Sequence, residues 1–387
     1  MTIAKFRLET RAWLEENCPP STRGQAKLYE GVTKVTISDP DTLLWIERMV
    51  EKGWTVPDWQ TLRTFTFCLL AQLWLIPGVY AADEKDSAEN EFHKNTEGVQ
   101  DHVFKHGEIK RTYKLHVPEN LAENAPLLFV LHGMSMTSDW TYGRGFNELA
   151  DQHGFVVVYP QSLEKSIYLT DFLGLTDLAW IEVTKILRWN AENADDRYGG
   201  TSDVEFLSQL ARHLQQEYRL NPEKTFVAGF SNGGYMSYTL LCQAGDTFRG
   251  AGIVAGLMNG VTVDSCSPGG PKPLIHLHGT ADSMVPIEGG DAKDKDNLPT
   301  PSAHDSVKYF AKLNNATKPE TVKVSENTTA YIYRPEGAGA EARFYRIEGF
   351  IHYWPGTPYV GKEKGKQMED NSGINATELI WEFFSRY

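Results

Sequence analysis

The sequence predicts an α/β fold for residues 105–387, with a mostly parallel β-sheet that carries helices on both faces. From Ile109 onward, short β-rich runs alternate with helical patterns, which is typical of such a sheet. Several of the runs are continuously apolar, as expected for strands buried on both faces. The chain has 387 residues, of which 41% are hydrophobic, so it has ample material for a large packed core.

The individual elements follow from this alternation. Strands are expected at residues 111–117, 127–131, 155–159, 225–228, 250–254, 274–277 and 343–347. Helices are expected at residues 147–153, 203–218, 234–243, 302–314 and 376–385. The stretch at residues 162–200 is rich in Leu, Ile and Trp and is a candidate cap over the sheet.

Charge and cysteine content exclude several classes of function. The formal net charge of -13 argues against nucleic acid or an anionic membrane as a partner. The 4 cysteines include no C-x-x-C pair, so neither a zinc ribbon nor a dithiol redox site is expected. The acidic run at residues 289–297 lacks the ligand spacing of a calcium loop. We therefore expect no metal and no cofactor.

Residues 1–60 lack the alternation of strands and helices that the rest of the chain shows. Apolar residues recur at helical spacing in residues 5–16 and 42–52, which predicts two short helices. The segments RAWLEENCPPSTR and DTLLWIERMVEKGWTVPDWQ resemble the N-terminal helical region of acyl-CoA dehydrogenases. This resemblance covers residues 3–59 only. The flavin domain and catalytic carboxylate of that family have no counterpart here. We interpret residues 1–60 as a remnant fused upstream, the alternative being a genuine accessory domain.

Residues 61–82 have the composition of a signal peptide, although they lie inside the chain. Arg63 provides the positive region, an apolar stretch too short to span a bilayer follows, and Val79-Tyr80-Ala81 resembles a cleavage site. The alternative is a buried core helix. Cleavage after Ala81 or Ala82 would give a secreted or periplasmic protein without a stable membrane anchor. The polar residues 83–104 are expected to form a linker before the catalytic domain.

The most informative motif is G-x-S-x-G at Gly229-Phe230-Ser231-Asn232-Gly233, between an apolar strand and an apolar helix. The glycines allow a tight turn that lifts the serine hydroxyl out of the sheet. The helix that follows supplies backbone N–H groups for an oxyanion. This context predicts an α/β-hydrolase fold with Ser231 as the nucleophile.

Chain order selects the partners of this serine. In this fold the order is serine, acid, histidine, so both partners must follow Ser231. Asp282 comes directly after a predicted strand, in a turn, and is the expected acid; the alternative is a turn-capping residue. His276 and His278 precede that acid, and His304 opens a predicted helix. His352 follows a late strand in a loop and is the expected base.

An oxyanion hole needs two N–H donors. Asn232 follows the nucleophile and supplies the first, and the backbone of Met134 is the expected second donor, in the loop after His132-Gly133. Two roles stay open for His132. It either sets the geometry of this loop or takes part directly in the reaction.

Five motifs in order carry a resemblance: LHGMSMT, DVEFLSQLARHLQQEYRLNPEKTFVAGFSNGGYMSY, IVAG, HGTADSMVP and HYWPG. Over residues 100–387 the chain resembles the polyhydroxybutyrate depolymerase and feruloyl or acetylxylan esterase family of secreted α/β hydrolases. The resemblance implies Ser231, Asp282 and His352 as nucleophile, acid and base. The family usually has Gly-Gly-His before Trp-Pro-Gly, whereas Phe350 and Ile351 precede His352 here. Met134 and Met136 also stand where smaller or polar residues are commoner.

Further residues are candidates for contacting substrate or for forming a disulfide. Trp180, Trp189 and Trp354 are candidates for an aromatic substrate groove, the alternative being that each packs in the core. Cys242 and Cys266 are expected to pair if their Cα atoms lie within about 7 Å; otherwise they are free thiols.

The sequence thus predicts a secreted serine esterase that acts on a 3-hydroxyalkanoate polyester or its oligomers. The alternative within the class is a feruloyl or acetylxylan esterase on plant polysaccharide. Outside that class, a non-catalytic binding protein or an accessory factor of acyl-CoA dehydrogenase stays open, as does the oligomeric state.

Overall fold

The computed structural model describes residues 48, 101–168, 182–191, 202–290, 299–357, 362–363, 366–367 and 369–387. By its internal contacts the chain forms two units, residues 1–85 with 164–186 and residues 86–163 with 187–387. Apart from Arg48, which is helical, the predictions for residues 1–60 and 61–82 lie outside the described residues. Trp180 lies outside them as well.

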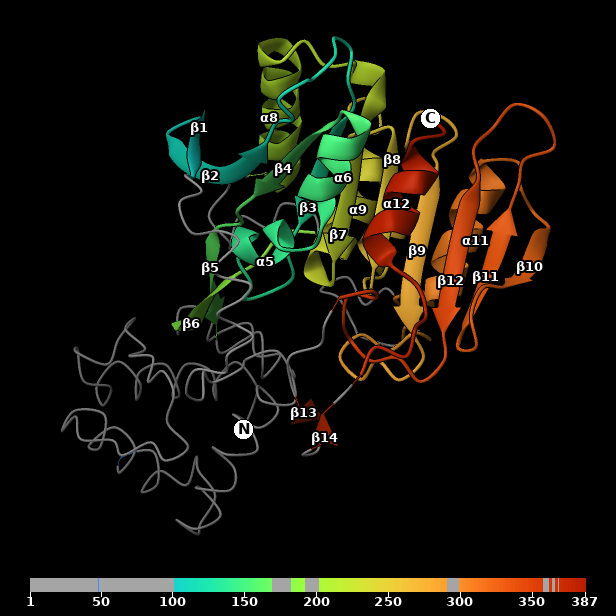
Figure 1. Ribbon diagram of the computed structural model, residues 1–387. Coiled ribbons are helices and arrows are strands. Elements are labelled where there is room, and N and C mark those ends of the chain that lie inside the picture. The colour runs from blue at the N-terminus through green and yellow to red at the C-terminus, as the bar shows by residue number, and fades with distance from the viewer. Residues whose placement is uncertain are drawn as a thin grey trace. The chain divides into compact units, whose positions relative to one another are not determined.

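One sheet of ten strands forms the centre of the second unit, in the order β1-β2-β4-β3-β7-β8-β9-β12-β11-β10 (Figure 1). Its strands are β1 (His102–His106), β2 (Ile109–His116), β3 (Leu127–Leu131), β4 (Val156–Pro160), β7 (Thr225–Phe230), β8 (Gly250–Val254), β9 (Leu274–Gly279), β10 (Pro319–Lys323), β11 (Thr328–Tyr333) and β12 (Ala342–Ile347). The six strands from β4 to β12 in this order run parallel, and antiparallel strands flank them on both sides. Every residue of β3, β4, β7, β8 and β9 is buried, as expected for the mostly apolar central strands of a sheet covered on both faces; His276 and His278 on β9 are the main polar exceptions.

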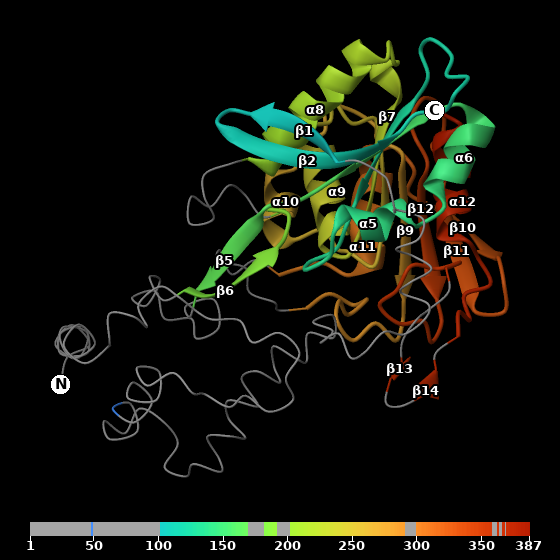
Figure 2. The same cartoon turned by 60° about the vertical axis from the view of Figure 1, so that its left-hand side comes forward.

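Helices cover both faces of this sheet, as the turned view in Figure 2 shows. On one face, α6 (Phe146–His153) and α12 (Ala376–Phe384) pack on a core that includes Phe155, Phe226 and Ile380. On the other, α8 (Asp203–Glu217), α9 (Asn232–Gln243) and α11 (Ala303–Leu313) pack on a core that includes Phe129 and Phe310. The sheet therefore separates two apolar cores, which is the arrangement predicted from the alternating pattern.

The remaining elements are short. They are α5 (Ser138–Tyr142), the 3₁₀ turn η4 (Pro222–Lys224), α10 (Gly260–Ser265), the pair β5 (Glu164–Tyr168) and β6 (Glu182–Leu187), and the pair β13 (Lys362–Glu363) and β14 (Lys366–Gln367). β5 lies in the first unit, and both β5 and β6 fall in the stretch at residues 162–200 that the sequence suggested as a cap.

Three strands of the large sheet were not expected from the sequence. β1 begins at His102, inside the segment 83–104 that was predicted to be a linker, so that prediction is wrong at its end. β10 is mostly exposed and carries Glu320 and Lys323, so it lacks the apolar run by which a buried strand is recognised. β11 alternates buried and half-buried residues, the pattern of a flanking antiparallel strand.

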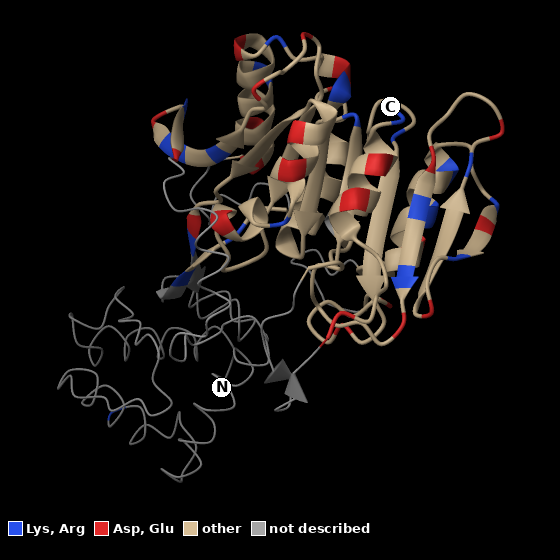
Figure 3. Ribbon diagram, in the orientation of Figure 1, with Lys and Arg blue, Asp and Glu red and all other residues tan. Residues whose placement is uncertain are grey.

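Charged residues occur mainly on helices and at strand ends, and few occur in the middle of the sheet (Figure 3). Within the described ranges, no helix is both long and apolar enough to cross a bilayer.

Candidate active site

Ser231 lies in the tight turn between β7 and α9. Its φ of 53° and ψ of -119° put it in a region that residues other than glycine seldom adopt. Its N–H donates to the carbonyl oxygen of Val254 on β8 (2.9 Å), and its own carbonyl accepts from Tyr235 (3.0 Å). The side chain is partly exposed. This is the geometry of a nucleophile elbow, as the G-x-S-x-G motif predicted.

The two glycines of the motif are required by close backbone packing. A Cβ atom on Gly229 would lie 2.1 Å from the carbonyl oxygen of Gly233. A Cβ atom on Gly233 would lie 2.2 Å from the carbonyl oxygen of Leu131, at the end of β3. The first turn of α9 therefore sits directly against the ends of two strands, which only glycine permits at these positions.

The acid and base loops leave neighbouring parallel strands. Gly279 at the end of β9 pairs with Ile347 at the end of β12, so both loops begin at the same edge of the sheet. The N–H of Thr280 donates to the carbonyl of Ile347 (2.9 Å), and that of Ala281 donates to the carbonyl of Phe350 (3.0 Å). These bonds hold the two loops together beyond the sheet.

Asp282 and His352 are in hydrogen-bonding contact. Nδ1 of His352 lies 2.7 Å from Oδ2 of Asp282, and the two side chains are 6% and 0% exposed. Oδ1 of Asp282 accepts from the N–H groups of Met284 (2.9 Å) and Val285 (2.8 Å). Burial alone would raise the pKa of this carboxyl, but contacts with His278 and His352 outweigh it and hold the pKa well below its usual range. Asp282 is therefore an ionised, fixed acceptor for the imidazole of His352.

The imidazole of His352 also lies beside the strand that ends at Ser231. Its ring centroid is 4.8 Å from that of Phe230, the residue before the nucleophile. Within the described chain, the hydroxyl of Ser231 makes no hydrogen bond to His352. A serine hydroxyl rotates freely, and catalytic hydrogen bonds often tighten only when substrate is bound. The structure thus brings Asp282 and His352, the predicted acid and base, together and places His352 next to the elbow.

The loop after β3 lies against the nucleophile. A Cβ atom on Gly133 would be 3.3 Å from Cβ of Ser231. The carbonyl of Gly133 accepts from Nδ1 of His132 (2.7 Å) and from the N–H of Met136 (3.3 Å). In a trans peptide the next N–H points the opposite way, so the N–H of Met134 is turned away from these internal donors. In the parts of the chain described, the backbone N–H groups of Met134 and Asn232 have no hydrogen-bond partner.

His132 holds this loop in place. Its ring is fully buried, and its Nε2 accepts from the backbone N–H of Ser162 (3.1 Å). Because a backbone N–H can only donate, the proton of the neutral ring sits on Nδ1 and is donated to Gly133. Burial lowers the pKa of His132 to about 4, so the ring stays neutral near pH 7. Of the two roles left open by the sequence, the structure assigns His132 the setting of loop geometry.

Trp189 and Trp354, the two candidate tryptophans that the structure describes, do not line a groove. Trp189 and Trp354 are both 0% exposed. The indole of Trp189 donates to the carbonyl of His132 (3.0 Å), and that of Trp354 donates to the hydroxyl of Thr377 (3.0 Å). The prediction that they contact substrate is therefore wrong, because a large apolar ring with a satisfied N–H is more stable in the core.

Trp189 still supports the site indirectly. Its backbone N–H donates to the side-chain oxygen of Asn232 (2.6 Å), and its carbonyl accepts from the Asn232 amide (3.2 Å). The residue after the nucleophile is thus fixed through its side chain, which leaves its backbone N–H for other contacts.

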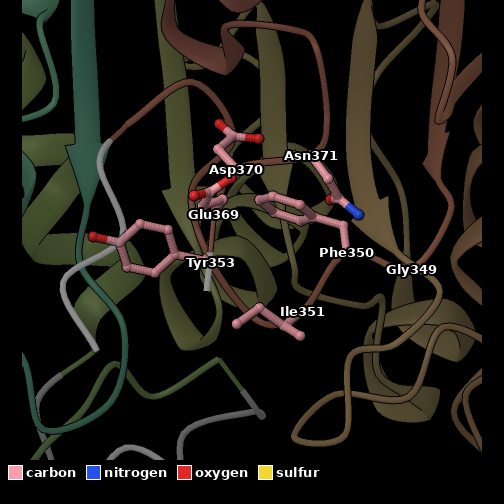
Figure 4. Close-up of a pocket in the computed structure, with 7 residues that line it drawn as sticks. All are labelled: Gly349, Phe350, Ile351, Tyr353, Glu369, Asp370 and Asn371. Carbon is pink, nitrogen blue, oxygen red and sulfur yellow. The ribbon is translucent and has the colours of Figure 1, made fainter. Parts of the chain in front are cut away.

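A small pocket lies beside the base loop (Figure 4). On one side it is lined by Phe350, Ile351 and Tyr353, which flank His352 in the sequence. Residues 369–371 line it on the other side, with two carboxylates among them. Neither Ser231 nor His352 is among the lining residues, so this pocket adjoins the triad without containing it.

Cys242 and Cys266 form a disulfide, with Cα atoms 4.5 Å apart. The bond joins the last turn of α9 to the residue that ends α10. Among the described residues, no group of three His, Cys, Asp or Glu side chains is arranged to hold a metal ion.

One residue of the site was not recognised from the sequence. Nε2 of His278 lies 3.4 Å from Oδ2 of Asp282, whereas the sequence excluded His278 as the base because it precedes the acid. The available signal was the spacing of His276, His278 and Asp282, because residues two apart on a strand share a face and continue toward the loop.

Parts of the chain are similar in sequence to known proteins. Residues 190–268, which include the elbow, match the model of the prolyl oligopeptidase family. A bifunctional acetylxylan esterase/xylanase of Neocallimastix patriciarum is 26% identical over 62% of this chain, but the match covers 31% of that protein. Poly(3-hydroxyalkanoate) depolymerase C of Paucimonas lemoignei is 24% identical over 64% of this chain and 59% of its own length.

Among solved structures, an acetyl xylan esterase from Aspergillus awamori is similar, with a TM-score of 0.47 and 15% identity over 66% of this chain and 94% of that one. The strand order, the elbow and the loop positions decide the fold. The chain has the α/β-hydrolase fold. Its sequence similarity is to carboxylic ester hydrolases, and it spans under a third of one and about three fifths of the other of the two relatives named above.

Proposed function

We propose that the protein is a secreted serine carboxylic ester hydrolase that works through an acyl-enzyme. The observation that carries this proposal is the hydrogen bond between His352 and Asp282, at the sheet edge where Ser231 forms the elbow. A serine hydroxyl becomes a good nucleophile only when a histidine takes its proton and a carboxylate fixes that histidine. Ser231, His352 and Asp282 lie at the same edge of the sheet, which supports these roles.

In the proposed reaction, Oγ of Ser231 attacks the ester carbonyl carbon while Nε2 of His352 takes the hydroxyl proton. Asp282 holds the Nδ1 proton and stabilises the imidazolium. The backbone N–H groups of Met134 and Asn232 bind the oxyanion. His352 then gives its proton to the leaving alcohol, and a water molecule activated by His352 releases the acid from Ser231. No metal or cofactor takes part in these steps.

As substrate we propose a 3-hydroxyalkanoate polyester or its oligomers. The motif resemblance and the similarity to poly(3-hydroxyalkanoate) depolymerase C support this choice. The second candidate is an acetyl or feruloyl ester on plant polysaccharide, which the similarity to an acetylxylan esterase/xylanase favours. Secretion through residues 61–82 is part of the proposal and rests on the sequence of that segment alone.

The test compares the full chain with Ser231→Ala and with Ser385→Ala, a matched control at an exposed serine near the C-terminus. Each is assayed on p-nitrophenyl butyrate, hydroxybutyrate oligomers, acetylated xylan and methyl ferulate. We expect hydrolysis by the wild type and the control, and a loss of roughly 10³-fold or more in Ser231→Ala. The ranking of substrates decides between the two candidates.

The hypotheses outside the esterase class have separate readouts. A fluorophosphonate probe should label the wild type at Ser231 and leave Ser231→Ala unlabelled. A folded wild-type chain that neither reacts with the probe nor hydrolyses any ester would favour a non-catalytic protein. A yellow, flavin-bearing preparation would point instead to an accessory factor of acyl-CoA dehydrogenase.

A further inference from the structure

Behind the acid loop lies a buried chain of three hydrogen-bonded side chains. The hydroxyl of Tyr238 lies 2.8 Å from Nδ1 of His276, and Nε2 of His276 lies 3.1 Å from Nδ1 of His278. Tyr238 and His276 are 0% exposed and His278 is 1% exposed. Buried titratable groups are costly unless they are paired, and the proposed reaction steps use none of these three.

The chain connects two parts of the catalytic site. His276 and His278 are two residues apart on β9, so both side chains project from the same face of the sheet. This is the face that α9 covers. Tyr238 belongs to α9, the helix that begins directly after Ser231. Asp282 follows β9 by a short loop. The three side chains therefore run from the nucleophile helix to the carboxylate of the acid loop.

The direction of the hydrogen bonds is fixed by one carbonyl. Nε2 of His278 lies 2.8 Å from the carbonyl oxygen of Val285, which can only accept, so His278 carries its proton on Nε2. Nδ1 of the neutral His278 ring is then an acceptor, and it accepts a hydrogen bond from the Nε2–H of His276. Nδ1 of His276 in turn accepts from the hydroxyl of Tyr238. Burial lowers the pKa of His276 well below its usual value, which keeps this ring neutral.

The same Nε2–H of His278 also faces the catalytic carboxylate. It lies 3.4 Å from Oδ2 of Asp282, the oxygen that accepts from His352 at 2.7 Å. The other oxygen already accepts two backbone N–H groups. Within the described residues, Asp282 thus accepts three hydrogen bonds, one on Oδ2 and two on Oδ1, and the Nε2–H of His278, whose 2.8 Å hydrogen bond goes to the carbonyl of Val285, adds a longer polar contact to Oδ2.

We propose that His278 is a positioning residue for Asp282, and that His276 and Tyr238 keep His278 in the tautomer whose Nε2–H faces the carboxylate. This inference rests on the proposed function, in which Asp282 orients His352. His278 withdraws part of the negative charge of Oδ2 and prevents the carboxylate from rotating. Without this N–H, Asp282 interacts more strongly with the imidazolium of His352 but in a less defined orientation.

Two consequences for catalysis follow. The chemical step slows because the orientation of His352 is less defined, while substrate binding is unaffected because none of the three side chains reaches the surface. Without the His278 N–H, Asp282 keeps more negative charge beside the base, so the acid limb of kcat/KM moves to higher pH. Other ionisable groups near the chain are His304 of α11, whose charge acts on His276, and Arg346 of β12, which is paired with Glu348.

The test uses His278→Gln and His278→Asn in the full chain. Gln places an amide N–H about as far from the backbone as Nε2, whereas Asn ends one bond earlier and cannot reach Oδ2. We expect His278→Asn to lose about tenfold to hundredfold in kcat, the effect of a lost hydrogen bond to a charged group, with KM within about twofold. Its acid limb should move up by roughly half a pH unit or more. His278→Gln should keep most of the activity and the wild-type acid limb.

Equal activity and pH profiles in both variants and the wild type would overturn the inference. Equal losses in both variants at every pH, with lowered thermal stability and no shift of the acid limb, would show a purely structural role and would overturn it as well.

A second measurement does not need catalysis. Nitrogen-15 NMR of histidine side chains in the full chain should show His276 and His278 as Nε2–H tautomers, and Tyr238→Phe should disturb both signals. An Nδ1–H tautomer at His278 would overturn the inference. If the wild-type chain hydrolyses no ester, the proposed function fails, whereas the tautomers still decide whether the hydrogen bonds run toward Asp282.

Discussion

The imidazole of His132 donates a hydrogen bond from Nδ1 to the carbonyl oxygen of Gly133, 2.7 Å away. This contact turns the following N–H, that of Met134, away from the protein interior. The ring of a fully buried histidine thus sets the direction of a proposed oxyanion donor without touching the substrate itself. A defect at His132 should therefore appear in the rate of reaction and in the pH dependence of stability.

Replacing His132 by leucine should lower kcat by about a hundredfold with little change in KM. The Gly133 carbonyl loses the shorter of its two internal hydrogen bonds and keeps only the 3.3 Å one from Met136, so the Met134 N–H is held less firmly for the oxyanion. Loss of one oxyanion donor costs this order of rate. Steady-state kinetics on p-nitrophenyl butyrate check the prediction. An unchanged kcat in a folded variant would mean that Met134 is not an oxyanion donor.

His132 also predicts a pH dependence of stability. Its pKa is about 4 in the folded protein, against about 6.5 for an unperturbed histidine, so only the unfolded chain takes up this proton between these values. The stability contributed by the neutral ring is complete above about pH 6.5 and falls toward pH 4, by at most about 1.4 kcal/mol per pH unit. Urea unfolding of the wild type and His132→Leu at pH 5 and 7 measures this. The stability difference between the two proteins should be smaller at pH 5.

Asp282→Asn should reduce kcat/KM by about 10³ to 10⁴-fold while leaving the protein folded. An asparagine keeps the size of the side chain but can present an N–H to His352, which favours the wrong tautomer of the imidazole. Asp264→Asn, at an exposed position in α10, is the matched control and should behave like the wild type. Full activity in Asp282→Asn would show that another carboxylate serves His352.

Removal of the disulfide should destabilise the protein without abolishing the reaction. Cys242 and Cys266 are separated by 24 residues, and a closed loop of this length corresponds to about 3 kcal/mol in the chain-entropy model. The double variant Cys242→Ser, Cys266→Ser should lower the free energy of unfolding by about 2 to 4 kcal/mol. Wild-type protein unfolded in the presence of a reductant should show the same decrease, whereas the double variant should not respond to the reductant.

Local sequence was sufficient to predict the elbow, because Gly229 and Gly233 have no room for a side chain and the flanking strand and helix are strongly apolar. Chain order led to Asp282 and His352, and their side chains are in contact because the strands before them are neighbours in the parallel sheet. Both inferences depend on features that this fold constrains tightly.

Other features depend on packing between distant segments, which a single sequence does not reveal. The sequence around Trp189 and Trp354 fits a substrate groove and a packed core equally well. Only the burial of these side chains in the structure distinguishes the two. The contact of His278 with Asp282 arises from the course of the loop after β9, and the bond between His276 and Tyr238 requires α9 to lie across that strand. β10 escaped prediction because its residues are exposed and charged.

The exposure of β10 has a consequence for the protein in solution. An edge strand offers free N–H and C=O groups to any second strand that can align with it. Here Pro319 lacks an N–H, and the charged side chains of Glu320 and Lys323 are exposed along the strand. Such an edge resists pairing with another molecule, so the sheet ends in a border that discourages aggregation even at high protein concentration.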